Sequence, residues 1–409
     1  MAGRRYLAAV SLTLAPARAL LADRSGRAVL FAFVLNSVVM GSWFARVPDV
    51  QARLGLGEAA LGWGLQGVPL GSVLAVVLGG RLVDRAGPGR ALVAAALLYC
   101  AAGVGPALAP SLAWLVVAAL AFGVGNGLMD VAMNAEAVAV ERRLGRRVIA
   151  TCHGGWSLGA VAGASLGSFA IARGVAPGLH LGAVAVVMAV VLVAMRRAYL
   201  GLPHREGSTR PPALSLPRRS LIGLATLAAL VLFAESAMGD WSGVYLRRTL
   251  GASDAVGALG YVAFSGAMAA GRLFGDGVAE RLGSAAVVRY GLALAVGGLG
   301  LALWIGSVPV AIAGFACAGL GLSGAVPALF RGGADAPSTT PGAGVAAVAS
   351  VGYVGIVSQA PLLGAVAERT SVTAAYGLAL GGLAVAALLA PAAFARAARP
   401  GPGASGPHR

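Results

Sequence analysis

The chain has 409 residues, of which 58% are hydrophobic and only 11% are charged. This composition excludes a soluble protein of this size, because so apolar a surface would not stay in water. The formal net charge of +16 does not indicate nucleic-acid binding, since all 31 basic residues are arginines that lie between apolar runs and not on one basic face. The sequence therefore predicts an all-α integral membrane protein.

Residues 1–27 are expected to form a cytoplasmic tail and not a secretory signal, because Pro16 and Arg18 interrupt the apolar run. Twelve apolar segments follow, most of them close to the ~20 residues that a helix needs to cross about 30 Å of hydrocarbon. In the first half they are 28–45, 59–79, 89–108, 112–135, 148–172 and 178–195. In the second half they are 221–246, 256–275, 284–306, 308–330, 342–364 and 372–395. We expect six-helix bundles at 28–195 and 220–395, a cytoplasmic linker at 196–219 and a disordered tail at 396–409.

Arginine and tryptophan set the orientation. With both termini in the cytoplasm, 25 of the 31 arginines fall on the cytoplasmic side, as the positive-inside rule requires. The six expected in outer loops are Arg46, Arg53, Arg173, Arg247, Arg248 and Arg369. Tryptophans also fall near the outer ends of their spans, where an amphipathic ring suits the interface. These are Trp43, Trp63, Trp114, Trp241 and Trp304.

The chain repeats itself at nearly half its length. A shift of 196 residues places the glycine, acid, arginine and glycine of GGRLVDRAGPGR (79–90) on those of GDGVAERLG (275–283). The run MGSW (40–43) returns as MGDW (238–241) at a shift of 198. A constant period predicts two homologous halves in parallel orientation, the arrangement of a transporter built from two six-helix bundles.

Glycines four residues apart within the spans predict helices that approach closely. The pairs are Gly67 and Gly71, Gly123 and Gly127, and Gly159 and Gly163. Helices with such faces pack tightly and still slide past one another.

We expect no cofactor and no metal. The chain contains no lysine, so a phosphate-binding G-x-x-x-x-G-K-[ST] loop cannot occur and ATP is not expected as the direct energy source. The three cysteines, Cys100, Cys152 and Cys317, are scattered within spans and indicate neither disulfides nor a metal site. Coupling to an ion gradient, or no coupling, remains.

At residues 79–90 the chain resembles the major facilitator superfamily, whose signature loop between helices 2 and 3 reads G-x-L-x-D-R-x-G-R-R. The matching residues are Gly80, Leu82, Asp84, Arg85, Gly87 and Arg90. The resemblance implies twelve transmembrane helices in two pseudo-symmetric six-helix bundles, with both termini cytoplasmic. It also implies that this loop is a conformational latch, with a counterpart in the second half at Glu280, Arg281 and Gly283.

A narrower resemblance begins at MDVAMNA (129–135), which is similar to the acid-x-x-x-Asn segment of fucose-permease-like transporters. It implies that Asp130 and Asn134 hold that group's helix 4 carboxylate and asparagine. With HGGWSLG (153–159), DWSGVYLR (240–247) and GRLFGD (271–276), the chain most resembles YbjJ-type bacterial inner-membrane proteins. Fucose permeases also have an aspartate in helix 1, where this chain has Asn36.

Carboxylates within spans are the strongest candidates for function. A charge at the helix centre costs about 2.5–3.5 kcal/mol, so such a group must be paired, protonated or in contact with water. Glu235 lies about 14 residues into its span, flanked by apolar residues, and we expect it to couple protons or bind solute. Asp130 shares a helix face with Asn126 and Asn134 and forms either part of the site or a polar clamp between helices.

Other polar groups in the spans are weaker candidates. Glu136 and Asp240 are expected near the interfaces, and His153 and Trp156 enter their span from the cytoplasmic side. Several more side chains either line a cavity or form hydrogen bonds between helices. These are Asn36, Gln66, Tyr261, Tyr353 and Gln359.

The sequence thus favours a secondary transporter of the cytoplasmic membrane, which carries a small polar, sugar-like solute by proton symport. One alternative is a proton-coupled exporter of amphipathic compounds, and another is a receptor or scaffold that transports nothing. An enzyme is not expected, because no nucleophile, base and orienting group occur in recognisable spacing. The expected partners are a small solute, protons and membrane lipids, without nucleic acid, and the expected functional unit is a monomer.

Overall fold

A computed structural model describes residues 18–145, 148–199, 215–337 and 339–399, without the side chains of 77–84, 150, 273–281 and 341. The described backbone is dominated by helices, and eleven of its segments are long and apolar enough to cross a membrane. One expected span, 256–275, is not among these eleven. It lies within α11 (Asp254–Leu282), a helix of 29 residues that packs against α8 and α13.

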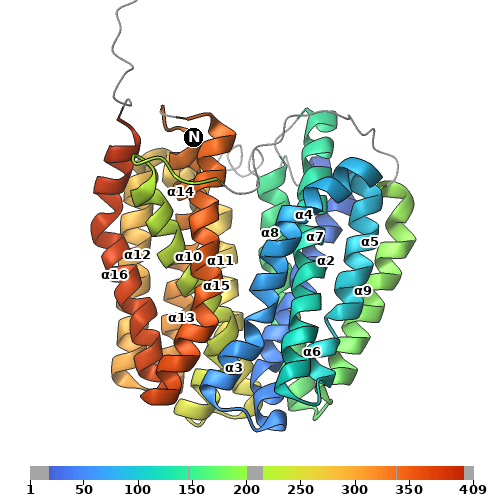
Figure 1. Cartoon of the computed structure of the whole chain (residues 1–409), viewed down its shortest axis with the longest axis vertical. Helices are drawn as coiled ribbons and strands as arrows, with labels where there is room; N and C mark the ends of the chain where they lie inside the picture. Colours follow the sequence, from blue (N-terminus) through green and yellow to red (C-terminus); the bar gives the residue numbers. More distant parts are fainter. Residues whose placement is uncertain (1–17, 146–147, 200–214, 338, 400–409) are drawn as a thin grey trace, which may run out of the picture.

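The first half of the chain forms one group of helices, blue to green in Figure 1. Its helices are α2 (Arg24–Leu54), α3 (Glu58–Leu65), α4 (Gly67–Ala86), α5 (Pro88–Ala102), α6 (Gly105–Leu108), α7 (Leu112–Leu144), α8 (Ile149–Ala172) and α9 (Pro177–Tyr199).

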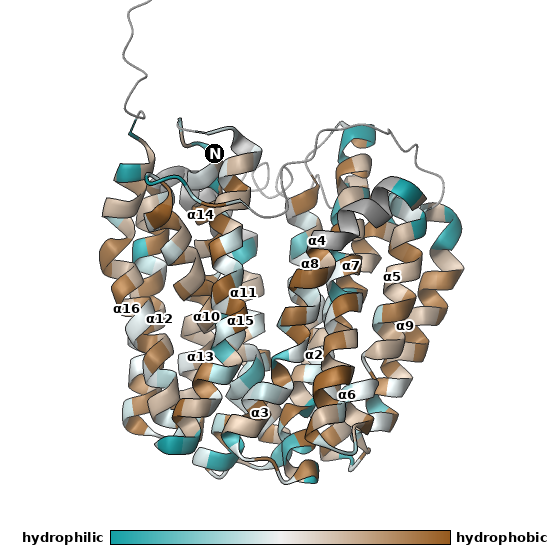
Figure 2. Cartoon of the chain, in the orientation of Figure 1, coloured by the Kyte–Doolittle hydropathy of each residue, from teal (hydrophilic) through white to brown (hydrophobic). Residues whose placement is uncertain are grey.

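The second half forms a neighbouring group, yellow-green to red in Figure 1. Its helices are α10 (Ile222–Val244), η1 (Tyr245–Thr249), α11, α12 (Ser284–Ile305), α13 (Val308–Leu322), α14 (Ala325–Ala334), α15 (Pro341–Arg369) and α16 (Val372–Ala397). The end of α9, the start of α10 and the end of α16 lie at the same end of the molecule, which the arginine distribution marks as cytoplasmic. Figure 2 shows hydrophobic residues along the lengths of the helices and hydrophilic residues gathered at their ends.

The duplication predicted from the sequence extends to backbone angles. Gly87 caps α5 with φ 79° and ψ 151°, and Gly283, its equivalent at a shift of 196 residues, caps α12 with φ 79° and ψ 156°. This region of backbone space is accessible to glycine and strained for any residue with a Cβ atom. The glycine of the latch motif is therefore needed to turn the chain sharply between two spans in both halves.

Helix packing repeats in the same way. A Cβ atom on Gly123 would collide with the carbonyl oxygen of Val68, which brings α7 against α4. At the equivalent positions, a Cβ atom on Gly319 would collide with the carbonyl oxygen of Phe264, which brings α13 against α11. The expected close contacts through small residues are thus present, and they recur in both halves.

Several expectations about the outer ends were wrong. The first span does not end near residue 45, because α2 continues through Pro48 to Leu54, so Arg46 and Arg53 lie in a helix and not in a loop. Trp43 and Trp241 are 1% and 0% exposed, because α2 and α10 are enclosed by other helices. Trp63, Trp114 and Trp304 are exposed, as an interfacial position requires.

Candidate functional site

A cavity of about 160 Å³ lies between the two halves. The first half contributes α2 and α8 to its wall, and the second half contributes α10, α11 and α15. The wall is largely aromatic and aliphatic, with a few polar groups. The lining residues are Phe44, Trp156, Ser157, Ala160, Leu232, Glu235, Ser236, Gly239, Tyr261, Phe264, Ser265, Met268 and Ile356.

Glu235, the strongest candidate from the sequence, lines this cavity from α10. Its Oε1 atom lies 3.4 Å from Nη2 of Arg272 on α11, and each side chain is 21% exposed. Its Oε2 atom is buried without a hydrogen-bond partner among the described residues. Glu235 is therefore held by one long ion pair and keeps an unused acceptor.

Arg272 links the two halves and was not predicted as a site residue. Its Nη1 atom donates a hydrogen bond of 2.9 Å to Ser157 Oγ on α8, and its guanidinium carbon lies 6.0 Å from the centroid of the Trp156 ring. This arginine is one of the 25 that the positive-inside rule places on the cytoplasmic side. Its position ten residues before the end of a long helix places it within the bundle instead, where it reaches Glu235.

Behind Trp156, a chain of hydrogen bonds runs through the first half. Trp156 Nε1 donates to Asn36 Oδ1 at 2.8 Å, and Asn36 Nδ2 donates to Asn126 Oδ1 at 2.9 Å. Asn126 Nδ2 in turn donates to Ser72 Oγ at 3.1 Å. Asn36 is only 3% exposed, so it supports the cavity wall through Trp156 and does not itself line the cavity.

The pair Asp130 and Asn134 lies on α7 and does not line this cavity. Asn134 Nδ2 donates to Oδ1 of Asp130 at 3.2 Å and to its backbone carbonyl at 2.9 Å, one turn apart on the same helix. His153 lies one turn before Ser157 on α8, with its ring edge to face on Phe33 at 5.0 Å. Asp130, Asn134 and His153 are thus not among the residues that line the cavity with Glu235, although His153 lies near Arg272.

Other predicted polar residues have structural partners or are buried elsewhere. Gln359 on α15 donates to a carboxylate oxygen of Asp240 on α10, within the second half. Gln66 is 6% exposed at the break between α3 and α4. Glu136 is 1% exposed near the cytoplasmic end of α7, where its carboxylate faces Gly89 at the start of α5.

The described part of the latch motif is limited. Arg85 and Arg90 are exposed at the cytoplasmic end, and Gly87 and Gly283 have the positive φ given above. The side chains of Asp84, Glu280 and Arg281, and the surroundings of Gly80, lie outside the described residues. The contacts expected of the latch thus remain predictions.

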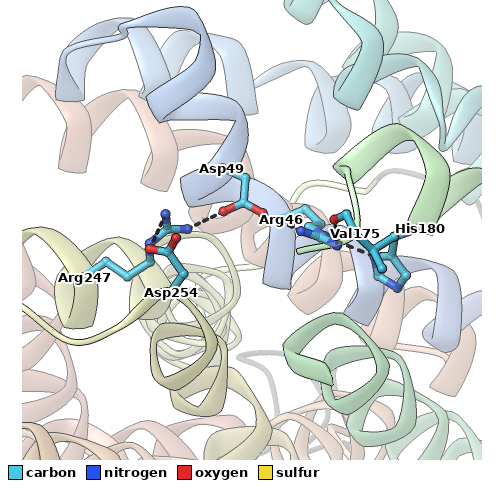
Figure 3. A network of polar contacts seen from close by, with 6 residues as sticks. All are labelled: Arg46, Asp49, Val175, His180, Arg247 and Asp254. Carbon is cyan, nitrogen blue, oxygen red and sulfur yellow. Dashed lines mark hydrogen bonds and ion pairs between the residues drawn. The ribbon is translucent and has the colours of Figure 1, made fainter. Parts of the chain in front are cut away.

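The outer ends of the two halves are joined by ion pairs, shown in part in Figure 3. Asp49 on α2 accepts from Arg247 of the second half at 2.5 Å and from Arg46 at 2.7 Å. Arg247 also pairs with Asp254 at 2.7 Å. Arg46 is 2% exposed and donates to Nδ1 of His180 at 3.2 Å, so a residue expected in a loop is buried in this network.

Two helix crossings also join the halves at the outer side. Ser168 Oγ on α8 donates to the carbonyl of Ala255 on α11 at 2.8 Å. On the opposite side of the interface, the backbone N–H of Ala59 on α3 donates to Glu368 of α15 at 3.2 Å, and Gly364 packs on α3. Ser168 and Gly364 are 196 positions apart in the chain, and so are Ala59 and Ala255. The two crossings are therefore equivalent under the duplication.

Comparisons with known proteins agree with this architecture. The Major Facilitator Superfamily model matches residues 28–358. An uncharacterised MFS-type transporter of Yersinia pestis is 33% identical, over 85% of this chain and 90% of its own. An uncharacterised transporter of Sinorhizobium fredii is 32% identical, over 89% of this chain and 97% of its own. The membrane protein MosC of Rhizobium meliloti is 32% identical, over 83% of each chain.

Solved structures show the same fold at low identity. The nucleoside transporter NupG aligns with a TM-score of 0.69 at 13% identity, over 91% of this chain and 99% of its own. A bacterial homologue of the human lysosomal transporter Spinster aligns with a TM-score of 0.66 at 14% identity, over 90% and 94%. The all-helical membrane fold predicted from the sequence is confirmed. The chain belongs to the major facilitator superfamily, and it is a multi-pass membrane transporter of small molecules and not an enzyme.

Proposed function

We propose that the protein is a proton-coupled symporter, which moves a small polar solute across the cell membrane by alternating access, with Glu235 as the proton carrier. The observation that carries this proposal is the position of Glu235: it lines the cavity between the halves, it is held by one long ion pair, and it has an unused oxygen. A buried carboxylate of this kind accepts a proton without losing a strong partner.

The coupling has an energetic basis. Moving one elementary charge across a potential of 100 mV supplies about 2.3 kcal/mol, and about 1.4 kcal/mol corresponds to a tenfold concentration ratio. One coupled charge thus supports roughly 50-fold accumulation of a neutral solute. A single intramembrane carboxylate is sufficient for this mechanism.

Alternating access is supported by the contacts at the outer end. Asp49–Arg247 and Ser168–Ala255 join the halves there, so we propose that this conformation is closed to the outside. Opening to the outside then requires these contacts to break while contacts form at the latch motif on the cytoplasmic side. The signature glycine turns at Gly87 and Gly283 support the latch assignment.

The solute class is supported by resemblance to known transporters. The likeness of residues 129–135 to fucose-permease-like transporters, and of the whole chain to YbjJ-type proteins, favours a polar metabolite. We propose Asp130 and Asn134 as a second polar position in the path of the solute. We also propose that the monomer is the functional unit, because the cavity is formed within one chain.

A second candidate is a proton-coupled exporter of amphipathic compounds, and the aromatic wall formed by Phe44, Trp156 and Tyr261 favours it. The position of Arg272 is unfavourable to the cationic members of this class, since it repels a cation that approaches Glu235.

The test uses proteoliposomes loaded with a pH-sensitive dye and exposed to a panel of sugars, polyols, nucleosides, amino acids and organic acids. We expect one or more solutes to evoke proton influx through the wild-type protein. Glu235→Gln should abolish that influx while the protein stays folded, and Asp335→Asn, which neutralises an exposed acid at the cytoplasmic end, should not. Wild-type proton influx through Glu235→Gln would refute the assignment.

A further inference from the structure

Arg272 has more hydrogen-bond donors than the described residues use. A guanidinium carries five N–H donors. Among the described residues, its hydrogen-bond partners are Ser157 at 2.9 Å and Glu235 at 3.4 Å. A strong pair between a guanidinium and a carboxylate has N···O distances of about 2.7–2.9 Å and is often bidentate. Glu235 therefore forms only a long contact with Arg272, through one of its two oxygens.

The charge balance at this position depends on one proton. When Glu235 is ionised, it neutralises Arg272. When Glu235 is protonated, a single positive charge remains at a partly buried position inside the membrane, which is costly unless an anion compensates for it. Among the described residues, the titratable groups near the pair include Tyr261 on α11, His153 on α8 and Asp240 on α10, and Asp240 accepts from Gln359.

We propose that the transported solute carries a carboxylate, and that Arg272 binds it when Glu235 is protonated. This inference rests on the proposed function and names the solute class. A carboxylate fits for two reasons: the planar fork of arginine matches it bidentately, and one negative charge balances the site, whereas a phosphate monoester brings an excess of charge. In the unloaded protein, the carboxylate of Glu235 occupies the place of the solute.

The cavity defines the remainder of the solute. Trp156 presents its ring near the guanidinium, and the rings of Phe44 and Tyr261 meet edge to face at 4.8 Å on the same wall. A cavity of about 150 Å³ holds a benzene molecule, so the 160 Å³ here suits an apolar or flat body of similar size. The class is thus small monocarboxylic acids with a compact, partly apolar body.

This arrangement also sets the direction of coupling. Protonation of Glu235 releases Arg272, so the proton and the anion bind together and move in the same direction. A cationic solute would instead compete with the proton for Glu235, and the two would exchange. Because one proton and one monovalent anion carry no net charge, transport should respond to a pH gradient and not to the membrane potential.

The test measures binding of benzoate and nicotinate to the purified protein in detergent by calorimetry, with benzamide and nicotinamide as neutral counterparts of the same shape. We expect the acids to bind with millimolar or tighter affinity, and the amides to bind about tenfold or more weakly than the acids. Binding of the acids should weaken as the pH rises. Glu235→Gln should bind the acids independently of pH, and at alkaline pH about tenfold tighter than the wild type.

Arginine variants separate binding from a structural role. Arg272→Gln should weaken acid binding about tenfold or more, and Arg272→Lys should retain part of it because the charge remains. The double variant Glu235→Gln/Arg272→Gln leaves no unpaired charge at these two positions and should fold, yet it should not recover acid binding. Arg289→Gln, which removes an exposed arginine at the start of α12, is the matched control and should bind as the wild type.

Three results would overturn the inference: no acid binding at millimolar concentration, equal binding of acids and amides, or recovered binding in the double variant. Failure of the proposed function is seen separately, as the absence of solute-evoked proton influx in proteoliposomes. If a solute evokes that influx through the wild type, and clamping the membrane potential at a constant pH gradient changes its rate, the symporter stands and the carboxylate assignment falls.

Discussion

Trp156 connects the cavity wall to the interior of the first half. Its indole N–H donates a hydrogen bond to Asn36 Oδ1, which belongs to a buried network, and its ring faces Arg272. Trp156→Phe keeps an aromatic ring but leaves the acceptor of Asn36 without its donor, at a cost of about 1–3 kcal/mol.

We expect Trp156→Phe to lower thermal stability in detergent and to weaken solute binding. Trp63→Phe, which changes a ring that is 61% exposed at the outer end, is the control and should alter neither. A Trp156→Phe protein as stable as the wild type would show that this hydrogen bond contributes nothing.

At the glycine turns of the cytoplasmic end, substitution should change the free energy of unfolding through backbone conformation alone. No atom of the described residues lies within 4 Å of a Cβ atom built on Gly87 or Gly283, so alanine meets no steric obstacle from them and encounters an unfavourable φ of 79°. Each Gly→Ala change should therefore destabilise the protein by about 1 kcal/mol or more.

The control for these variants is Gly377→Ala within α16, where a Cβ atom also meets nothing within 4 Å. This variant should be neutral or stabilising by about 0.5–1 kcal/mol, because alanine favours the helix. Unfolding in denaturant measures all three, and destabilisation by Gly377→Ala equal to that of Gly87→Ala would contradict the role of the backbone.

Single residues were only partly predictable from the sequence. Glu235 was identified because an acid inside an apolar run is costly and needs a reason to be there. Arg272 was missed because it lies close to the cytoplasmic end of its predicted span, where an arginine is expected on the basis of topology. Only the three-dimensional pairing with Glu235 distinguishes it from the arginines that set orientation.

Among the elements, α2 and η1 are joined by an ion pair at the outer side. Asp49 and Arg247 are 198 residues apart, the shift that relates MGSW to MGDW, so the ion pair joins equivalent positions of the two halves. Residues near an axis of pseudo-symmetry meet their own equivalents. The pair is therefore well placed to separate when the halves tilt apart.

We expect Asp49→Asn to favour the outward-open state. With both side chains partly exposed, loss of the pair should contribute about 1 kcal/mol, roughly a fivefold change in the ratio of the two states. Distances between spin labels on the outer ends of α3 and α15 measure that ratio.

Asp254→Asn is the matched control, because Asp254 also pairs with Arg247 but belongs to the same half. It should leave the distances between the halves unchanged. An equal shift in both variants would mean that Arg247 affects the ratio of the two states through contacts within the second half and not through its contact with Asp49.

The elements themselves were predicted well in number and order, and less well at their ends. Apolar length identifies a span, but it does not report that α2 continues for nine residues past residue 45 or that a helix breaks at Gln66. The continuation of α2 buries Arg46, which donates to His180 and to the carbonyl of Val175 in distant segments. Hydropathy contains no information about such partners.

At the scale of the whole molecule, the duplication was the most informative feature of the sequence. It predicted two equivalent halves, and the equivalent turns at Gly87 and Gly283 and the equivalent crossings of Ser168 with Ala255 and of Gly364 with Ala59 follow from it. It did not predict at which end of the interface the halves are joined, because both ends are compatible with the same repeat. The contacts at the outer end, such as the ion pair between Asp49 and Arg247, depend on the three-dimensional arrangement.

The central claim is that the cavity opens in turn to each side of the membrane. Its most direct test places a single cysteine at Ser236, which lines the cavity, in a chain whose Cys100, Cys152 and Cys317 are replaced by alanine. A membrane-impermeant thiol reagent is then applied to either face of sealed vesicles, with a cysteine at Trp63 as a control for the outer face. Alternating access predicts that Ser236→Cys is labelled from both sides, and labelling from one side alone would contradict it.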